Sequence, residues 1–139
     1  MREYLFRGKR IDNGEWVEGC LWVFDDYADI SYRDQEYSEI VNTVEVIPET
    51  VGQYTGLRDC KRTAEYPEGQ MIFEGDIVTI PDSKKLGLPA PIHYDCERAT
   101  FEVSRSGYNP LSLVDAREFY DVIGNIHDNR ELLKEGGEE

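Results

Sequence analysis

The stretch over residues 71–80 places the polar turn Glu74-Gly75-Asp76 between two short apolar runs. Gly75 lacks a Cβ and can adopt positive φ, and the Asp76 carboxylate can accept hydrogen bonds from backbone amides beyond the turn. The chain can therefore turn sharply there and continue into Ile77–Ile80, where every side chain is β-branched. This stretch predicts the entry into the central strand of a small β-structure.

Two segments near the N-terminus also have the pattern of strands. Asp12-Asn13-Gly14 lies between extended segments, and Asn-Gly is typical of the type I′ turn of a β-hairpin because both residues tolerate positive φ. The run over residues 20–24 is continuously apolar, is too short for a helix and ends at Asp25-Asp26. We therefore predict an N-terminal hairpin and then a core strand, with Trp22 in the core.

The rest of the chain alternates short extended segments with turns. Residues 40–47 are mostly β-branched and end at Pro48, which cannot donate a hydrogen bond to a neighbouring strand. Residues 81–91 contain three prolines and predict a loop. Residues 111–118 fit either a brief strand or a helical turn, and residues 118–126 predict the last strand.

Length and the C-terminal pattern set the expected domain limits. Asn129 can cap a short helix over residues 130–134, because its side chain can accept a hydrogen bond from a free backbone amide. A chain of 139 residues is long enough for one domain with a core. We predict a single domain over residues 1–135, with a subdivision near residues 48–52 as the alternative, and a frayed tail over residues 136–139.

The cysteines and the hydropathy indicate the cellular environment of the protein. Cys20, Cys60 and Cys96 are odd in number and widely spaced, which favours neither a disulfide framework nor a thiolate zinc site. No apolar run approaches the roughly 20 residues of a membrane helix, and the chain begins without a signal-peptide core. We expect a soluble, intracellular protein with reduced thiols that does not bind a membrane.

The charge is strongly negative and uneven. The chain carries 29 acids against 15 bases, a formal net charge of −14. This balance argues against direct binding of nucleic acid, which requires clustered Lys and Arg. Half of the excess lies between Asp25 and Glu49, where eight acids accompany the single base Arg33.

Two patterns superficially match metal sites. Asp25-Asp26 and Asp29 match an Asp-Asp-x-x-Asp magnesium pattern, but that chemistry requires the acids on one helix face, and here they follow a strand-like run. His93 and Cys96 have a His-x-x-Cys spacing, but a zinc site needs three or four ligands and no second cluster accompanies them. The sequence therefore predicts no metal, no cofactor and no catalytic residue.

Four motifs in order resemble the YopX family of small phage and prophage proteins. They are Arg2–Arg7, Val51–Asp59, Phe73–Val78 and Val122–Leu133. The resemblance covers nearly the whole chain and implies a mainly β fold of SH3-like barrel type, encoded by mobile genetic elements. We expect short antiparallel strands with a short C-terminal helix, in a protein of the host cytoplasm. The resemblance implies no established activity, so no catalytic residues can be carried over.

These observations leave three functional hypotheses. The first is a non-enzymatic interaction module whose acidic segment meets a basic protein, with six candidate contact residues: Asp25, Asp26, Tyr27, Asp29, Tyr32 and Tyr37. The second is a nuclease-like enzyme on an SH3-like barrel using Glu74, Asp76, His93 and His127, which the acidic balance disfavours. The third is a structural homo-oligomer. We prefer the first hypothesis, and we expect the protein to act through a protein partner or through self-association.

Overall fold

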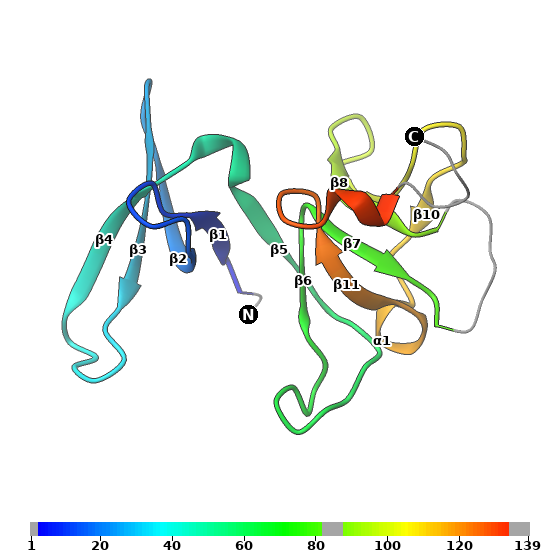
Figure 1. Cartoon of the computed structure of the whole chain (residues 1–139), viewed down its shortest axis with the longest axis horizontal. Coiled ribbons are helices and arrows are strands. Elements are labelled where there is room, and N and C mark those ends of the chain that lie inside the picture. The colour runs from blue at the N-terminus through cyan, green and yellow to red at the C-terminus, as the bar shows by residue number, and fades with distance from the viewer. Residues whose placement is uncertain (1–2, 82–87, 134–139) are drawn as a thin grey trace. The chain divides into compact units, whose positions relative to one another are not determined.

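The computed structural model describes residues 3–81 and 88–133, and it confirms a mainly β chain (Figure 1). The described residues form two compact units, which divide within strand β5 (Gly52–Arg58) between Tyr54 and Thr55. Strands pair in two antiparallel sheets, with the orders β4-β3-β2-β1-β5-β6 and β10-β9-β8-β7-β11. The pairing among the described residues does not close a barrel.

The first unit contains four strands, a 3-10 turn and the start of β5. Antiparallel registers join β1 to β2, β2 to β3 and β3 to β4. The buried residues Ala28, Ile30 and Val46 form a small core, and partly buried Val and Leu side chains pack against it. The elements are β1 (Phe6–Lys9), β2 (Trp16–Val23), β3 (Ala28–Arg33), β4 (Val41–Val46) and η1 (Pro48–Thr50).

The predicted N-terminal hairpin is confirmed, but its predicted type I′ turn is wrong. β1 pairs with β2 in a register that places Lys9 opposite Trp16. Gly14 has a φ of 75°, whereas Asn13 is not among the described residues with positive φ. Asn13 instead accepts a hydrogen bond from the Glu15 amide through its side chain (2.9 Å). The longer connection therefore needs only one left-handed residue, which glycine supplies.

The second unit contains the end of β5, six further strands and two short helical turns. β7 lies between β8 and β11, and β9 lies between β8 and β10. The elements are β6 (Met71–Phe73), β7 (Asp76–Thr79), β8 (Ala90–Asp95), β9 (Thr100–Val103), β10 (Leu111–Ser112), α1 (Ala116–Phe119), β11 (Asp121–Asn125) and η2 (Arg130–Leu133).

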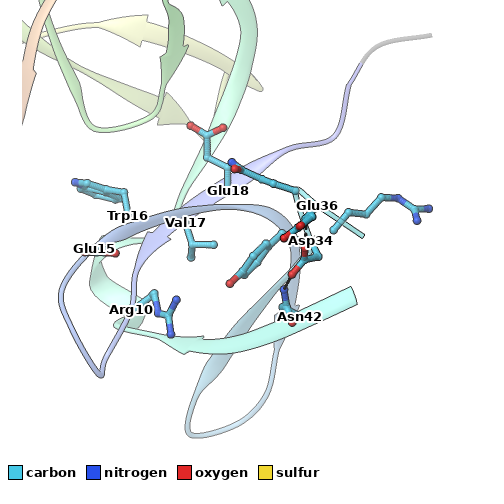
Figure 2. A pocket seen from close by; sticks show the side chains of 11 residues that line it. Arg10, Glu15, Trp16, Val17, Glu18, Asp34, Glu36 and Asn42 are labelled. Carbon is cyan, nitrogen blue, oxygen red and sulfur yellow. Dashed lines mark hydrogen bonds between the residues drawn. The ribbon is translucent and has the colours of Figure 1, made fainter. Parts of the chain in front are cut away.

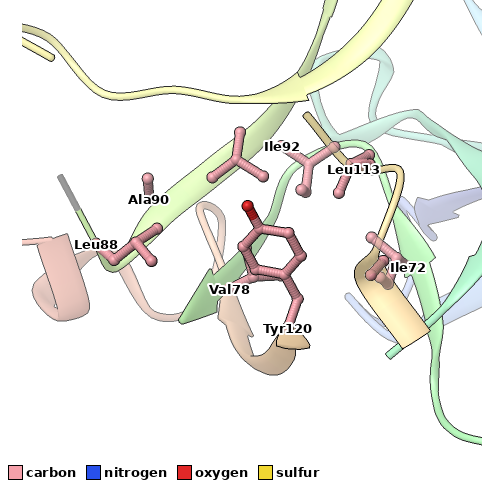
Figure 3. Close-up of a cluster of buried hydrophobic side chains, with 9 residues drawn as sticks. Ile72, Val78, Leu88, Ala90, Ile92, Leu113 and Tyr120 are labelled. Atoms are coloured by element: carbon pink, nitrogen blue, oxygen red, sulfur yellow. The ribbon is translucent and has the colours of Figure 1, made fainter. Parts of the chain in front are cut away.

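An aliphatic core surrounding Tyr120 holds the second unit together (Figure 3). The Tyr120 hydroxyl donates a hydrogen bond to the Ser112 carbonyl (3.3 Å). Burial, and secondarily the Asp115 carboxylate, raises the pKa of this phenol. Burying each large aliphatic side chain contributes about 1.5–3 kcal/mol. The core consists of Ile72, Val78, Leu88, Ala90, Ile92, Val103, Leu113, Ala116 and Tyr120.

The Glu-Gly-Asp turn leads into a strand as predicted, but this strand, β7, lies beside the edge strand β11 and is not the central strand of its sheet. The Asp76 carboxylate bonds to the backbone that precedes the turn. This carboxylate is buried and accepts a hydrogen bond from the Phe73 amide (2.7 Å). Gly75 has a φ of 94°, donates to the Ile92 carbonyl (2.8 Å) and accepts from the Ile126 amide (2.9 Å). The turn between β6 and β7 is therefore held by backbone hydrogen bonds to β8 and to the residue that follows β11.

Several predicted boundaries differ from the structure. The last strand, predicted over residues 118–126, is β11 and begins only at Asp121, because residues 118 and 119 belong to α1. The predicted strand over residues 20–24 is the end of β2. The predicted loop 81–91 ends too late, because β8 begins at Ala90, and residues 82–87 lie outside the described residues. Residues 111–118 contain both alternatives, since β10 is followed by the first turn of α1. In the predicted C-terminal helix, Arg130–Leu133 forms a 3-10 turn, while residue 134 and the tail at 136–139 lie outside the described residues.

Candidate partner-binding surface

The six candidate contact residues lie at two ends of β3. Asp25, Asp26 and Tyr27 form the turn between β2 and β3, and Asp29 follows at the start of β3. Tyr32 lies at the other end of β3, and Tyr37 lies in the loop before β4. A strand of this length spans about 17 Å. The structure therefore brings the first four residues together and separates them from the two tyrosines.

The end of β2 and the turn between β2 and β3 form a segment that we call the hairpin tip, defined as residues 22–27, which carries four exposed apolar side chains; Figure 1 shows its place at the end of the hairpin. The exposed fractions are 55% for Trp22, 73% for Val23, 44% for Phe24 and 42% for Tyr27. The rings of Phe24 and Tyr27 stack with their centroids 4.5 Å apart. The prediction that Trp22 lies in the core is wrong, because Trp22 lies on the sheet face opposite to the core residues Ala28 and Ile30.

Carboxylates lie beside the apolar side chains of the hairpin tip. Asp25 and Asp26 are exposed at the turn itself. Trp22 pairs with Asp29 across β2 and β3, and Asp29 pairs with Glu45 across β3 and β4, so these three side chains form a row on one sheet face. Like charges directly opposite each other in a sheet are destabilising. A cationic group bound at this row would relieve that repulsion.

A hydrogen-bonded ladder fixes the Trp22 ring on the same face. The indole Nε1 donates to the Ser31 hydroxyl (3.0 Å), and the Ser31 and Thr43 hydroxyls are 2.8 Å apart. The polar edge of the indole is therefore satisfied within the sheet, while more than half of the side chain is exposed. Exposed aromatic rings held in one orientation are typical of protein-binding surfaces.

A separate open pocket of about 730 Å³ lies at the other end of the first unit (Figure 2). Tyr32 lines it together with acids and two arginines. Arg10 is held by a bidentate ion pair with Asp12 (3.0 and 2.9 Å), and Arg33 donates to the Ser38 carbonyl (2.8 Å). Both guanidinium groups therefore stabilise neighbouring turns, and Trp16 and Val17 give the pocket apolar walls beside these charges.

Asp34 organises the loop beside this pocket. Its carboxylate accepts hydrogen bonds from the Tyr37 amide (3.0 Å) and the Glu36 amide (2.9 Å). These bonds lower the pKa of the carboxyl group below its ordinary value.

This lowered pKa predicts a pH dependence of the loop. Because the folded pKa of Asp34 is depressed, its stabilising contribution is present above the unfolded pKa of about 3.9 and is lost as the pH falls through the folded pKa. A carboxyl-carbon NMR titration should place the Asp34 midpoint below that of an ordinary aspartate. Asp34→Asn should abolish the accompanying shifts of the Glu36 and Tyr37 amides. An Asp34 midpoint at or above the ordinary value would contradict this assignment.

The structure does not assemble the metal patterns. Within residues 3–81 and 88–133, no group of three or more His, Cys, Asp or Glu side chains could hold a metal ion. Asp25, Asp26 and Asp29 belong to a hairpin and not to a helix face. His93 lies on β8, where its ring is 3.1 Å from the Ser104 hydroxyl.

The structure also shows where the four residues of the nuclease hypothesis lie. Asp76 is buried and bonded to backbone. His127 donates its amide to the Asn125 side chain (2.9 Å) within the turn that follows β11. Glu74 belongs to the turn before β7, whereas His93 is exposed on β8.

A buried carboxylate that sequence reasoning missed organises the second unit. Asp59 is fully buried and accepts hydrogen bonds from the amides of Gln70 (2.8 Å), Val122 (3.0 Å) and Lys61 (3.3 Å). It thereby joins both ends of the 60–70 loop to β11. In the sequence, the position of Asp59 at the end of the Val51–Asp59 motif was the feature that could have indicated this structural role. Asn129, in the last motif, similarly accepts from the Asn125 amide (3.1 Å).

The protein is a small, acidic β protein. Side chains within its sequence motifs, among them Asp59, Asp76 and Asn129, make hydrogen bonds that stabilise the fold. The YopX protein family matches residues 5–134, and the chain belongs to this family. Membership fits a phage-type protein and confirms the resemblance seen in the four motifs. A comparison with curated proteins finds no match. Within the described residues, no helix has the length and apolar character needed to cross a membrane.

Proposed function

We propose that this protein is a non-enzymatic interaction module that binds a basic protein segment through the hairpin tip. The observation that carries the proposal is the exposure of four apolar side chains, including a stacked aromatic pair, beside Asp25, Asp26 and Asp29. Exposed apolar patches rimmed by polar groups are typical of protein interaction sites.

Charge determines which partner fits the tip. The acidic window around the tip attracts a basic partner and repels nucleic acid and a second copy of a chain of charge −14. Arg and Lys side chains can lie over exposed aromatic rings and reach carboxylates at the same time. The protein would act in the host cytoplasm. The proposed binding does not depend on an SH3-like barrel, which stays a prediction.

A peptide selection tests this function. We expect ligands selected from a random peptide library on the immobilised protein to be rich in Lys and Arg, and we expect their binding to weaken as salt rises. The variant Phe24→Ser/Tyr27→Ser should lose most of this binding while its thermal unfolding stays close to that of the wild type, since both rings are exposed.

The matched control replaces an exposed aromatic residue of the second unit. Tyr108→Ser removes a ring of similar exposure, 40%, far along the chain from the tip, and it should leave binding unchanged. Selected ligands that are acidic, or that bind the tip variant as well as they bind the wild type, would refute the proposal.

A further inference from the structure

The outer edge of β4 presents backbone groups in a defined pattern. β4 is the terminal strand of its sheet, with β3 on its inner side. The Ile11 amide donates to the Glu45 carbonyl (3.0 Å), and the Ile47 amide donates to the Lys9 carbonyl (2.8 Å). Residues 45 and 47 therefore direct their backbone groups away from β3. Since this direction alternates along a strand, Thr43 and Val41 direct theirs outward as well.

The inner side of the strand agrees with this assignment. The Asp34 amide donates to the Ile40 carbonyl (2.9 Å), so the even-numbered residue at the start of β4 faces the β3 side. Among residues 3–81 and 88–133, no hydrogen bond occupies the outward amide and carbonyl groups of Val41 and Thr43, so these groups form an open edge. Both residues are exposed. An open edge of this kind is a template for an added strand.

A pocket of about 310 Å³ adjoins this edge. Ile11 and Val44 give it apolar walls, and Asp12, Thr43 and Glu45 give it polar ones. The Asp12 carboxylate is paired with Arg10, whereas no hydrogen bond or ion pair within the described part of the chain holds the Glu45 carboxylate. Apolar walls ending at a carboxylate suit the stem and cationic head of a Lys or Arg side chain.

We propose that the partner binds as an extended basic segment added to the β4 edge, with one Lys or Arg side chain in this pocket reaching Glu45. The inference rests on the proposed function and specifies the binding mode. Backbone hydrogen bonds to Val41 and Thr43 supply affinity, and alternate side chains supply specificity. The Trp22–Asp29–Glu45 row joins this edge to the hairpin tip, so one segment can contact both.

Amide hydrogen exchange provides the test. The probe is a short peptide of alternating threonine and lysine, compared with its counterpart in which glutamate replaces lysine. At saturation, the lysine peptide should slow exchange at Val41 and Thr43 by about tenfold or more, and the glutamate peptide should not. Absence of protection with bound lysine peptide would overturn the inference. Protection that depends on protein concentration without peptide would also overturn it, because a second copy would then occupy the edge.

Two matched pairs of variants separate the contributions. Val41→Pro removes an outward amide, which an edge strand tolerates, and should weaken lysine-peptide binding about tenfold, whereas Val41→Ala keeps that amide and should bind normally. Glu45→Gln should weaken binding, whereas Glu49→Gln, which removes an exposed charge in η1, should not. If Val41→Pro binds normally while Phe24→Ser/Tyr27→Ser does not, this inference fails and the proposed function stands.

Discussion

Replacing Asp59 by asparagine is expected to lower the free energy of unfolding of the second unit by about 2–4 kcal/mol. The Asp59 carboxylate is fully buried, and its two oxygens accept three backbone amides from the 60–70 loop and β11. An asparagine side chain has one acceptor oxygen and places amide hydrogens against backbone donors. At least one buried amide is then left without an acceptor. Chemical denaturation followed by far-ultraviolet circular dichroism measures the loss.

The matched control for this substitution is Asp115→Asn. Asp115 is exposed, and its side chain makes no capping hydrogen bond at the start of α1. It should change the free energy of unfolding by less than about 0.5 kcal/mol. An Asp59→Asn variant as stable as the wild type would show that this carboxylate does not organise the unit, and would reopen a chemical role for the motif that it ends.

Replacing Gly19 by alanine is expected to destabilise the first unit by about 3 kcal/mol or more. A Cβ at this position would lie 2.9 Å from the Ser31 carbonyl carbon and even closer to its oxygen. Both obstacles are backbone atoms of β3, so no side-chain rotation can relieve the overlap. β2 and β3 would have to separate where Cys20 pairs with Ser31. Loss of the β2–β3 amide signals in an NMR spectrum would report it.

Gly14→Ala is the control for Gly19→Ala. Gly14 has positive φ, but nothing lies within 4 Å of an added Cβ, so only backbone strain of about 1 kcal/mol is expected. A Gly19→Ala variant with intact β2–β3 pairing and the stability of the wild type would contradict the close approach of these strands.

Local patterns were sufficient to predict much of the fold. β-branched and aromatic runs bounded by Gly, Pro, Asn and Asp predicted the strand class, the N-terminal hairpin and the Glu-Gly-Asp entry into β7. They were insufficient for Trp22, because the apolar run 20–24 has the composition of a buried strand. Which of its side chains are exposed depends on which face of the sheet the core covers. The division of the chain at β5 depends likewise on contacts distant in sequence.

The candidate site was predicted only in part. The charge pattern pointed to Asp25, Asp26, Tyr27 and Asp29, which the hairpin gathers, but it grouped them with Tyr32 and Tyr37, which lie at the far end of β3. Sequence separation alone gives no register, and the register determines which side chains share a face. For the same reason Glu45, distant from Trp22 in sequence, could not be assigned to the same row.

Chemical-shift mapping of a selected basic peptide on the isotope-labelled full chain tests the central claim most directly. If the shared motifs are structural and binding occurs on the first unit, shifts should concentrate at the hairpin tip, residues 22–27, and along Val41–Glu45. Shifts centred on Asp59, Gly75 and Asn129, with the tip unaffected, would contradict the account and place the functional site within the family motifs.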